Sequence, residues 1–202
     1  MTKTLIIFSR YPEAGKTKTR MIPALGALGA AELQREMTEY TLKTAIALQS
    51  SSDIAIQIHF AGGEIQLMRE WLGADFDYIP QTSGDLGTKM RSAFDLAFAS
   101  GNQQVVIIGI DCPDIDQEIL TTAFNSLEHH DLVLGVAADG GYYLIGLHRP
   151  IDLLFQNITW GTEQVLTQTK NIAQQLELDV YYLPTLADVD RPQDLKIWQK
   201  YT

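Results

Sequence analysis

The sequence predicts an α/β fold: a single Rossmann-like domain with a mainly parallel mixed sheet and helices on both faces. Short apolar runs rich in β-branched residues alternate with longer segments of helical periodicity, which is typical of parallel strands joined by crossover helices. The 202 residues suffice for one sizeable core, and the hydrophobic fraction of 46% and charged fraction of 20% are those of a globular protein. No repeat or linker divides the chain, so we expect one domain over residues 1–202.

In the N-terminal half, the apolar run at 4–8 predicts a buried strand. The prolines, glycines and basic residues of 9–26 then predict a loop, and apolar residues at helical spacing predict a helix over 28–48. By the same criteria we expect strands at 54–60 and 76–79 and helices at 65–72 and 84–99.

In the C-terminal half, 105–110 is the most strand-like run, and Asp116 is a suitable N-cap for a helix over 117–127. Asp139-Gly140-Gly141 predicts a hairpin turn between strands at 132–136 and 142–147, which adds an antiparallel pair. The remaining elements are a helix at 162–176, a strand at 180–183 and a closing helix at 192–201 with proline in its first turn.

The composition excludes several classes of protein. With 15 basic and 25 acidic residues the net charge is −10, which disfavours nucleic acid as a partner. No apolar run approaches the ~18 residues of a membrane span, and the N-terminal run is too short for a signal peptide. A single cysteine allows no internal disulfide and makes no zinc site by itself. We therefore expect a cytoplasmic protein.

Basic residues cluster between the first strand and the first helix. Arg10, Lys16, Lys18 and Arg20 lie within eleven positions, with Gly15 among them. Backbone N–H groups and cations at that place can converge on phosphate, so the cluster indicates a small anionic ligand. The spacing is not that of a P-loop. The alternative interpretation is a solvated basic loop.

Carboxylates follow two strands of the predicted sheet, the fourth and the last. Asp111 comes directly after the strand at 105–110, where a carboxylate can hold Mg²⁺ or Mn²⁺ against a diphosphate. Asp188 and Asp190 lie two apart in an extended segment, so both face the same side and both can reach one metal. Alternatively, Asp190 and Gln193 form a capping box that opens the last helix, which makes Asp188 the better ligand candidate.

Two glycine-containing segments complete the set of candidates. Gly84, Asp85, Gly87 and Lys89 lie at a predicted helix start, where glycines allow a ligand to approach the backbone closely, although a plain turn explains them equally well. Asp139 belongs to the hairpin turn and needs no further role, but an aspartate at the carboxyl edge of the sheet can also orient an acceptor hydroxyl.

Together these segments resemble a known family. The motifs are Phe8-Ser-Arg-Tyr-Pro12 with Gly15-Lys-Thr-Lys-Thr-Arg20, Gly84-Asp-Leu-Gly-Thr-Lys-Met90, Ile108-Gly-Ile-Asp-Cys-Pro-Asp114, Asp139-Gly-Gly-Tyr-Tyr-Leu-Ile-Gly146 and Asp188-Val-Asp-Arg-Pro-Gln-Asp-Leu195. In this order they resemble the DUF2064 group over essentially the whole chain. That group is also labelled "transferase 1, rSAM/selenodomain-associated" and is described as glycosyltransferase-like.

The resemblance implies the GT-A fold of nucleotide-diphospho-sugar transferases. It implies that Asp111 is the metal aspartate, that Asp188 and Asp190 are a late acidic pair, and that the 10–20 loop binds phosphate. It also places the nucleoside at 84–90. The chain departs from the related guanylyltransferases because the first loop lacks their Gly-Gly and Arg-Met-Gly patterns, and residues 135–138 lack the expected Gly-Pro-x-Glu or Gly-Pro-x-Asp.

Three functions remain open on the sequence. The first is metal-dependent group transfer from a nucleotide-sugar to an unknown small-molecule acceptor, with Asp139 as the candidate for activating the acceptor. The second is nucleotidyl transfer from an NTP, which the basic loop also fits. The third is a non-catalytic nucleotide-binding regulator.

Overall fold

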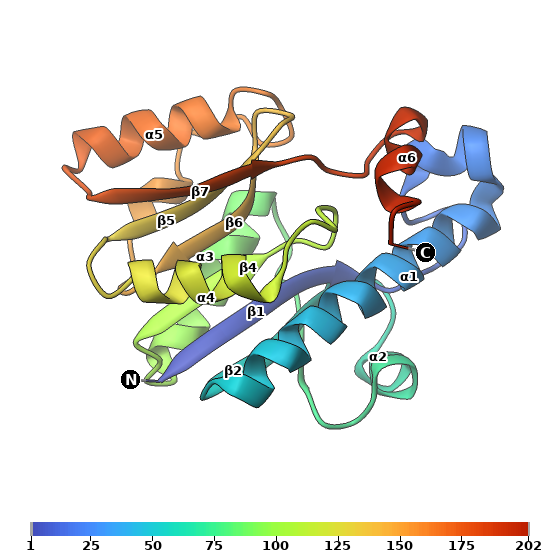
Figure 1. Ribbon diagram of the computed structural model, residues 1–202, viewed down its shortest axis with the longest axis horizontal. Coiled ribbons are helices and arrows are strands. Elements are labelled where there is room, and N and C mark those ends of the chain that lie inside the picture. Colours follow the sequence, from blue (N-terminus) through green and yellow to red (C-terminus); the bar gives the residue numbers. More distant parts are fainter. Residues whose placement is uncertain (1, 202) are drawn as a thin grey trace.

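The computed structural model describes residues 2–201 and shows a seven-stranded sheet (Figure 1). Its strands, in chain order, are β1 (Lys3–Arg10), β2 (Ile54–Ala61), β3 (Asp77–Pro80), β4 (Gln104–Ile108), β5 (Leu132–Ala137), β6 (Tyr142–Leu147) and β7 (Val180–Leu186). The spatial order is β3-β2-β1-β4-β6-β5-β7. β6 pairs antiparallel with both β4 and β5, whereas the other neighbouring strands pair parallel. The predicted α/β fold and the predicted hairpin are both confirmed.

Helices cover both faces of the sheet. They are α1 (Ile22–Ser51), α2 (Ile65–Leu72), α3 (Leu86–Ala99), α4 (Gln117–Ser126), α5 (Val165–Gln175) and α6 (Leu195–Trp198), with 3-10 turns η1 (Thr19–Met21), η2 (Asp152–Phe155) and η3 (Pro192–Asp194). Because successive strand residues face opposite sides, Leu5 and Ile7 pack with α1, α2, α4 and α6, whereas Ile6 packs with α3, α5 and η2.

The boundaries of several elements differ from the sequence prediction. β1 continues to Arg10, and a first turn of helix begins at Ile22 rather than at 28; the positive φ of Gly26 (70°) separates this turn from the rest of α1. Helix α3 starts at Leu86, since Asp85 caps it by accepting a hydrogen bond from the Thr88 amide. The Asp116 N-cap of α4 is confirmed.

The predicted closing helix at 192–201 is wrong in length. The chain forms the 3-10 turn η3 and then a single α-helical turn, α6. The capping box is also shifted by one residue, because Asp194 accepts hydrogen bonds from the amides of Asp190 and Arg191. Asp190 is therefore not the cap, and its carboxylate is available for another partner.

The C-terminal segment leaves the edge of the sheet and crosses to α1 (Figure 1). Trp198 packs edge-on against Tyr40 of α1, and its indole N–H donates to Glu36 over 3.2 Å. On the way, the Val189 amide donates to the carbonyl of Asp111 at 2.8 Å. This crossing brings residues 188–190 to the segment that follows β4. No helix within residues 2–201 is long and apolar enough to span a membrane.

Candidate functional site

A cleft of about 550 Å³ opens at the carboxyl ends of the parallel strands. It spans the ends of β1, β2, β4 and β5 and the start of the antiparallel β6. Ligands of open α/β sheets bind at this edge. Eight of the residues singled out in the sequence line it: Arg10, Lys18, Arg20, Lys89, Asp111, Asp139, Asp188 and Asp190.

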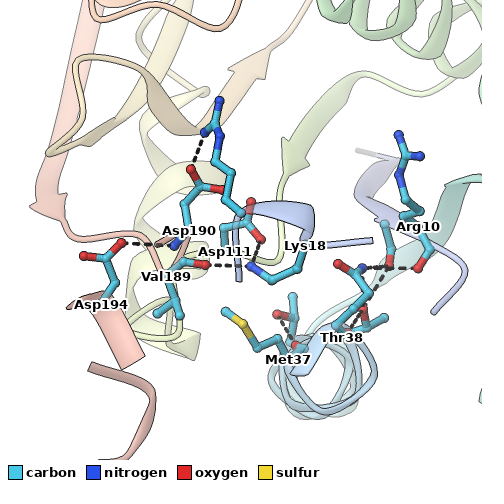
Figure 2. Close-up of polar contacts among 12 residues, drawn as sticks. Arg10, Lys18, Met37, Thr38, Asp111, Val189, Asp190 and Asp194 are labelled. Carbon is cyan, nitrogen blue, oxygen red and sulfur yellow. Dashed lines mark hydrogen bonds and ion pairs between the residues drawn. The ribbon is translucent and has the colours of Figure 1, made fainter. Parts of the chain in front are cut away.

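Lys18 lies at the centre of the charged part of the cleft. Its ammonium group donates to the Asp111 carboxylate and to the Val189 carbonyl, both at 2.7 Å, and its side chain is only 5% exposed (Figure 2). The backbone of Lys18 has a positive φ of 42° just before η1, which turns this side chain inward. Lys18 therefore ties the basic loop to the strand end and to the C-terminal crossing.

Arg20 forms a second contact between the same two segments. Its guanidinium donates to Asp190, and the pair is more open to solvent, with side chains 62% and 31% exposed. Hydrogen bonding to Asp190, followed by the charge of that carboxylate, raises the pKa of Arg20 above its ordinary value. The two basic residues thus face two carboxylates across the cleft.

Negative charge accumulates around Asp188. Burial and then the neighbouring charges of Asp139, Asp190 and Asp194 raise the pKa of its carboxyl group above the ordinary value. Asp139 is held by its own turn, because its Oδ1 accepts a hydrogen bond from the Gly141 amide at 2.9 Å. Carboxylates this close favour a bound cation, which would relieve their mutual repulsion.

Divalent cations of the Mg²⁺ type fit these residues only as an incomplete site. Among residues 2–201, no three His, Cys, Asp or Glu side chains are grouped so that they could hold a metal ion. Mg²⁺ is commonly bound by one or two carboxylates together with substrate phosphates and water. Asp111, with a half-exposed carboxylate, and Asp188 suit that arrangement, in which the phosphates of a ligand complete the shell.

The structure leaves five predicted site residues outside the lining of the cleft. Lys16 points to solvent and pairs with Glu13 at 2.7 Å, with its side chain 68% exposed. The other four, which help to shape the loop or the start of α3, are Gly15, Gly84, Asp85 and Gly87. Arg10 lines the cleft but lies apart from the Lys18–Asp111 pair (Figure 2).

Sequence reasoning missed Trp160. Its indole lines the cleft, meets Tyr142 edge-on with ring centroids 6.4 Å apart, and covers the start of α3. A Cβ atom at Gly87 would lie 2.5 Å from Trp160 Nε1, so only glycine fits there. The glycine pattern was visible in the sequence as a signal of close approach, but the approaching group is a side chain of the protein itself.

Cys112 is poorly suited to act as a nucleophile at this site. It is buried beside Asp111, and burial, followed by the charge of Asp111, raises the pKa of its thiol well above the ordinary value. A thiol in this state is a poor nucleophile, since the thiolate is the reactive form. Cys112 is thus a small, buried side chain that packs beside Asp111.

Comparison with solved structures defines the class of this fold. The chain is 32% identical to a protein from Desulfovibrio desulfuricans G20 that is provisionally assigned as a nucleotide-diphospho-sugar transferase; the match has a TM-score of 0.92 and covers 100% of this chain and 88% of that chain. The fold is that of nucleotide-diphospho-sugar transferases. The chain belongs to the DUF2064 family, described as "Uncharacterized protein conserved in bacteria", which residues 41–162 match.

More distant structures share the fold alone. CMP:2-keto-3-deoxy-manno-octonic acid synthetase complexed with CTP is 9% identical with a TM-score of 0.60, covering 100% of this chain and 98% of that chain. Rv0371C from Mycobacterium tuberculosis H37Rv, complexed with manganese, is 15% identical with a TM-score of 0.60, covering 100% of both chains. No curated protein matches the chain.

Proposed function

We propose that the chain is a metal-dependent transferase that acts on a nucleotide-sugar. The observation that carries this proposal is the meeting of Lys18 and Arg20 with Asp111, Asp188 and Asp190 in one cleft at the carboxyl ends of the strands. Basic side chains beside clustered carboxylates suit a diphosphate bound together with a divalent cation. A diphosphate alone would leave the carboxylates without a role, and a divalent cation alone would leave the basic side chains without one. The likeness to the Desulfovibrio protein supports the same class of substrate.

Asp111 and Asp188 would hold Mg²⁺ or Mn²⁺, with Asp190 as a further carboxylate beside them. When bound, the cation would neutralise negative charge on the diphosphate leaving group. Lys18 and Arg20 would contribute positive charge to the same phosphates, in a cleft where they are already fixed before the reaction. The manganese complex of Rv0371C supports a divalent cation in this fold.

The acceptor would enter on the side of Asp139. In the transfer, the acceptor hydroxyl oxygen bonds to the anomeric carbon as the bond from that carbon to the diphosphate oxygen breaks, and the bonding electron pair leaves with the nucleoside diphosphate. Asp139 would take the hydroxyl proton, because its carboxylate lines the cleft and the Gly141 amide holds it in place. The nucleoside would lie near the start of α3, where Lys89 lines the cleft.

Nucleotidyl transfer from an NTP is the second candidate. The observation in its favour is that the chain shares its fold with a CTP-bound synthetase along its entire length. In that reaction the acceptor would attack the α-phosphate and pyrophosphate would leave, and the same cations would neutralise it. Both reactions need the same charged groups, so the products decide between them.

A release assay over a panel of NTPs and nucleotide-sugars, with Mg²⁺ or Mn²⁺, tests the proposal. Release of a nucleoside diphosphate indicates glycosyl transfer, and release of pyrophosphate indicates nucleotidyl transfer. Tight nucleotide binding without either product would contradict both and leave the non-catalytic regulator. Asp111→Asn is the control variant, since it keeps the size of the side chain and removes the charge that the cation needs.

A further inference from the structure

Two ion pairs join charged groups of the cleft in the structure. Lys18 pairs with Asp111 at 2.7 Å, and Arg20 pairs with Asp190 (Figure 2). In both pairs the cation comes from the loop after β1 and the carboxylate from elsewhere, either the end of β4 or the C-terminal crossing. A divalent cation at Asp111, or a phosphate at Lys18, thus meets a group that already has a partner of opposite charge.

Lys18 is the more constrained of the two cations. Its side chain is 5% exposed, whereas that of Arg20 is 62% exposed. An ammonium group has three protons, and Lys18 donates to Asp111 and to the Val189 carbonyl. Val189 in turn donates its amide to the Asp111 carbonyl at 2.8 Å, so one side chain fixes the crossing segment against the strand end.

We infer that Lys18 is a positioning residue. In the free protein its ammonium group neutralises Asp111 in place of the metal ion, and it exchanges Asp111 for a phosphate when ligands bind. In the free state its ammonium holds Asp111 and residues 188–190 together. On binding, Asp111 turns to the divalent cation while Lys18 turns to a phosphate oxygen. Because this exchange presupposes that the cleft binds a cation and a diphosphate, it rests on the proposed function.

Partner exchange has a thermodynamic consequence. A metal ion alone must take Asp111 from Lys18, and a phosphate alone must take Lys18 from Asp111, so each ligand bears the cost of breaking the pair. When the metal ion and the phosphate bind together, the Lys18–Asp111 pair is broken only once. Each ligand therefore strengthens the binding of the other by the same factor. A lysine that only added positive charge to the phosphate site would give no such dependence on Asp111.

The first test measures Mn²⁺ alone, by electron paramagnetic resonance of the free ion. Lys18→Met keeps the aliphatic stem and releases Asp111, so we expect Mn²⁺ to bind about tenfold more tightly than to the wild type. Lys16→Met is the matched control, because it removes the same charge from the same loop at a residue paired with Glu13, and its affinity should stay within about twofold. Arg20→Met should fall between them, since its pair is more exposed.

The second test measures inorganic pyrophosphate in EDTA by calorimetric titration. Asp111→Asn releases Lys18, so pyrophosphate should bind several-fold more tightly without metal than it does to the wild type. Asp139→Asn is the control for the general effect of removing one negative charge from the cleft, because Asp139 pairs with the Gly141 amide rather than with a cation. The gain in Asp111→Asn should exceed the gain in Asp139→Asn.

The outcomes separate this inference from the proposed function. Equal or weaker Mn²⁺ binding by a folded Lys18→Met protein would overturn the exchange. If the wild type still bound nucleotide in a metal-dependent way, the proposed function would stand. Absence of Mn²⁺ binding in every variant, with and without nucleotide, would overturn both. A misfolded Lys18→Met protein is recognised by its thermal transition, and the Asp111→Asn titration then decides.

Discussion

The charged end of the cleft, with Lys18, Asp111 and Asp190, is held by ion pairs, whereas its packed end, where the Trp160 side chain lies against Gly87 of α3, is held by close packing. The charged end is assembled from three distant segments, namely the loop after β1, the end of β4 and the C-terminal crossing. The packed end leaves no room even for a methyl group. From this contrast we expect ligand-dependent change at the charged end and a fixed wall at the packed end.

The largest expected effect is at the charged end. Asp111→Asn should reduce turnover at least about a hundredfold, because charge on the leaving group would lose its neutralisation, which is worth several kcal/mol. It should also abolish the rise in melting temperature that Mn²⁺ and nucleotide give the wild type. Thermal transitions with and without both ligands, together with the release assay, measure these effects.

Two further variants rank the carboxylates by their contribution to metal binding. Asp188→Asn should lose nearly as much of the metal-dependent rise as Asp111→Asn. Asp190→Asn should lose less, because Asp190 pairs with the exposed Arg20 and the cap of the last turn is Asp194. A full metal-dependent rise in Asp111→Asn would show that the cation binds elsewhere.

The order of elements was predictable because periodicity and turn residues report on local structure. The grouping of Lys18, Asp111 and Asp188 at one edge followed from the rule that strand ends of a parallel sheet lie together. What the sequence did not provide was the partner of each group. The Lys18–Asp111 pair depends on how the loop after β1 folds over the end of β4, and the Arg20–Asp190 pair depends on the crossing of the C-terminal segment; both are tertiary features.

Other parts escaped prediction for different reasons. The 192–201 helix was predicted too long, because only one α-helical turn, α6, packs its apolar residues on α1. The alternative capping box at Asp190 and Gln193 was based on spacing alone, and the box lies one residue further along, at Arg191 and Asp194, a shift within the uncertainty of helix ends. Trp160 carried no motif, and its role in the wall emerges only from its contact with Gly87.

The second prediction uses pH to probe the packed floor beneath the cleft. The ring of His59 stacks on Phe8 with centroids 5.8 Å apart, and burial lowers the pKa of His59 to about 4. His59 takes up a proton below about pH 6.5 in the unfolded chain but only near pH 4 in the folded protein. The free energy of unfolding is therefore highest above pH 6.5 and decreases as the pH falls toward 4. The loss should be roughly 3 kcal/mol in the free energy of unfolding.

Urea unfolding at pH 7.5, 5.5 and 4.5 measures this loss. His59→Phe keeps a ring to stack on Phe8 and removes the titrating group, so its stability should fall less over the same range. His129→Gln removes an exposed histidine and should follow the wild type. An unchanged pH dependence in His59→Phe would assign the acid sensitivity to other groups.

The third prediction tests the fixed wall. Gly87→Ala places a Cβ atom 2.5 Å from the Trp160 indole, so overpacking should lower the free energy of unfolding by about 2 kcal/mol despite the better helix propensity of alanine. Gly109→Ala is the matched control, because a Cβ atom there meets nothing within 4 Å. Urea unfolding of both variants gives the comparison.

The same contact can be isolated by a double substitution. In a Trp160→Ala background the clash is absent, and Gly87→Ala should then be neutral or stabilising. A coupling free energy near zero between the two substitutions would show that the Trp160 side chain moves aside easily. The contrast between the charged end and the packed end of the cleft would then no longer hold.

The smallest expected effect separates the two lysines of one loop. Lys16 is 68% exposed, pairs with Glu13 and does not line the cleft, whereas Lys18 is 5% exposed and does line it. Calorimetric titration with the best nucleotide in the presence of Mn²⁺ should show Lys16→Ala within about twofold of the wild type, since a surface pair contributes at most about 1 kcal/mol. Lys18→Ala should bind at least about tenfold more weakly, because it loses a charge that would contact phosphate. Equal losses in the two variants would mean that the loop rearranges on binding and brings Lys16 into the cleft, so the basic loop would have to be treated as one mobile anion-binding unit.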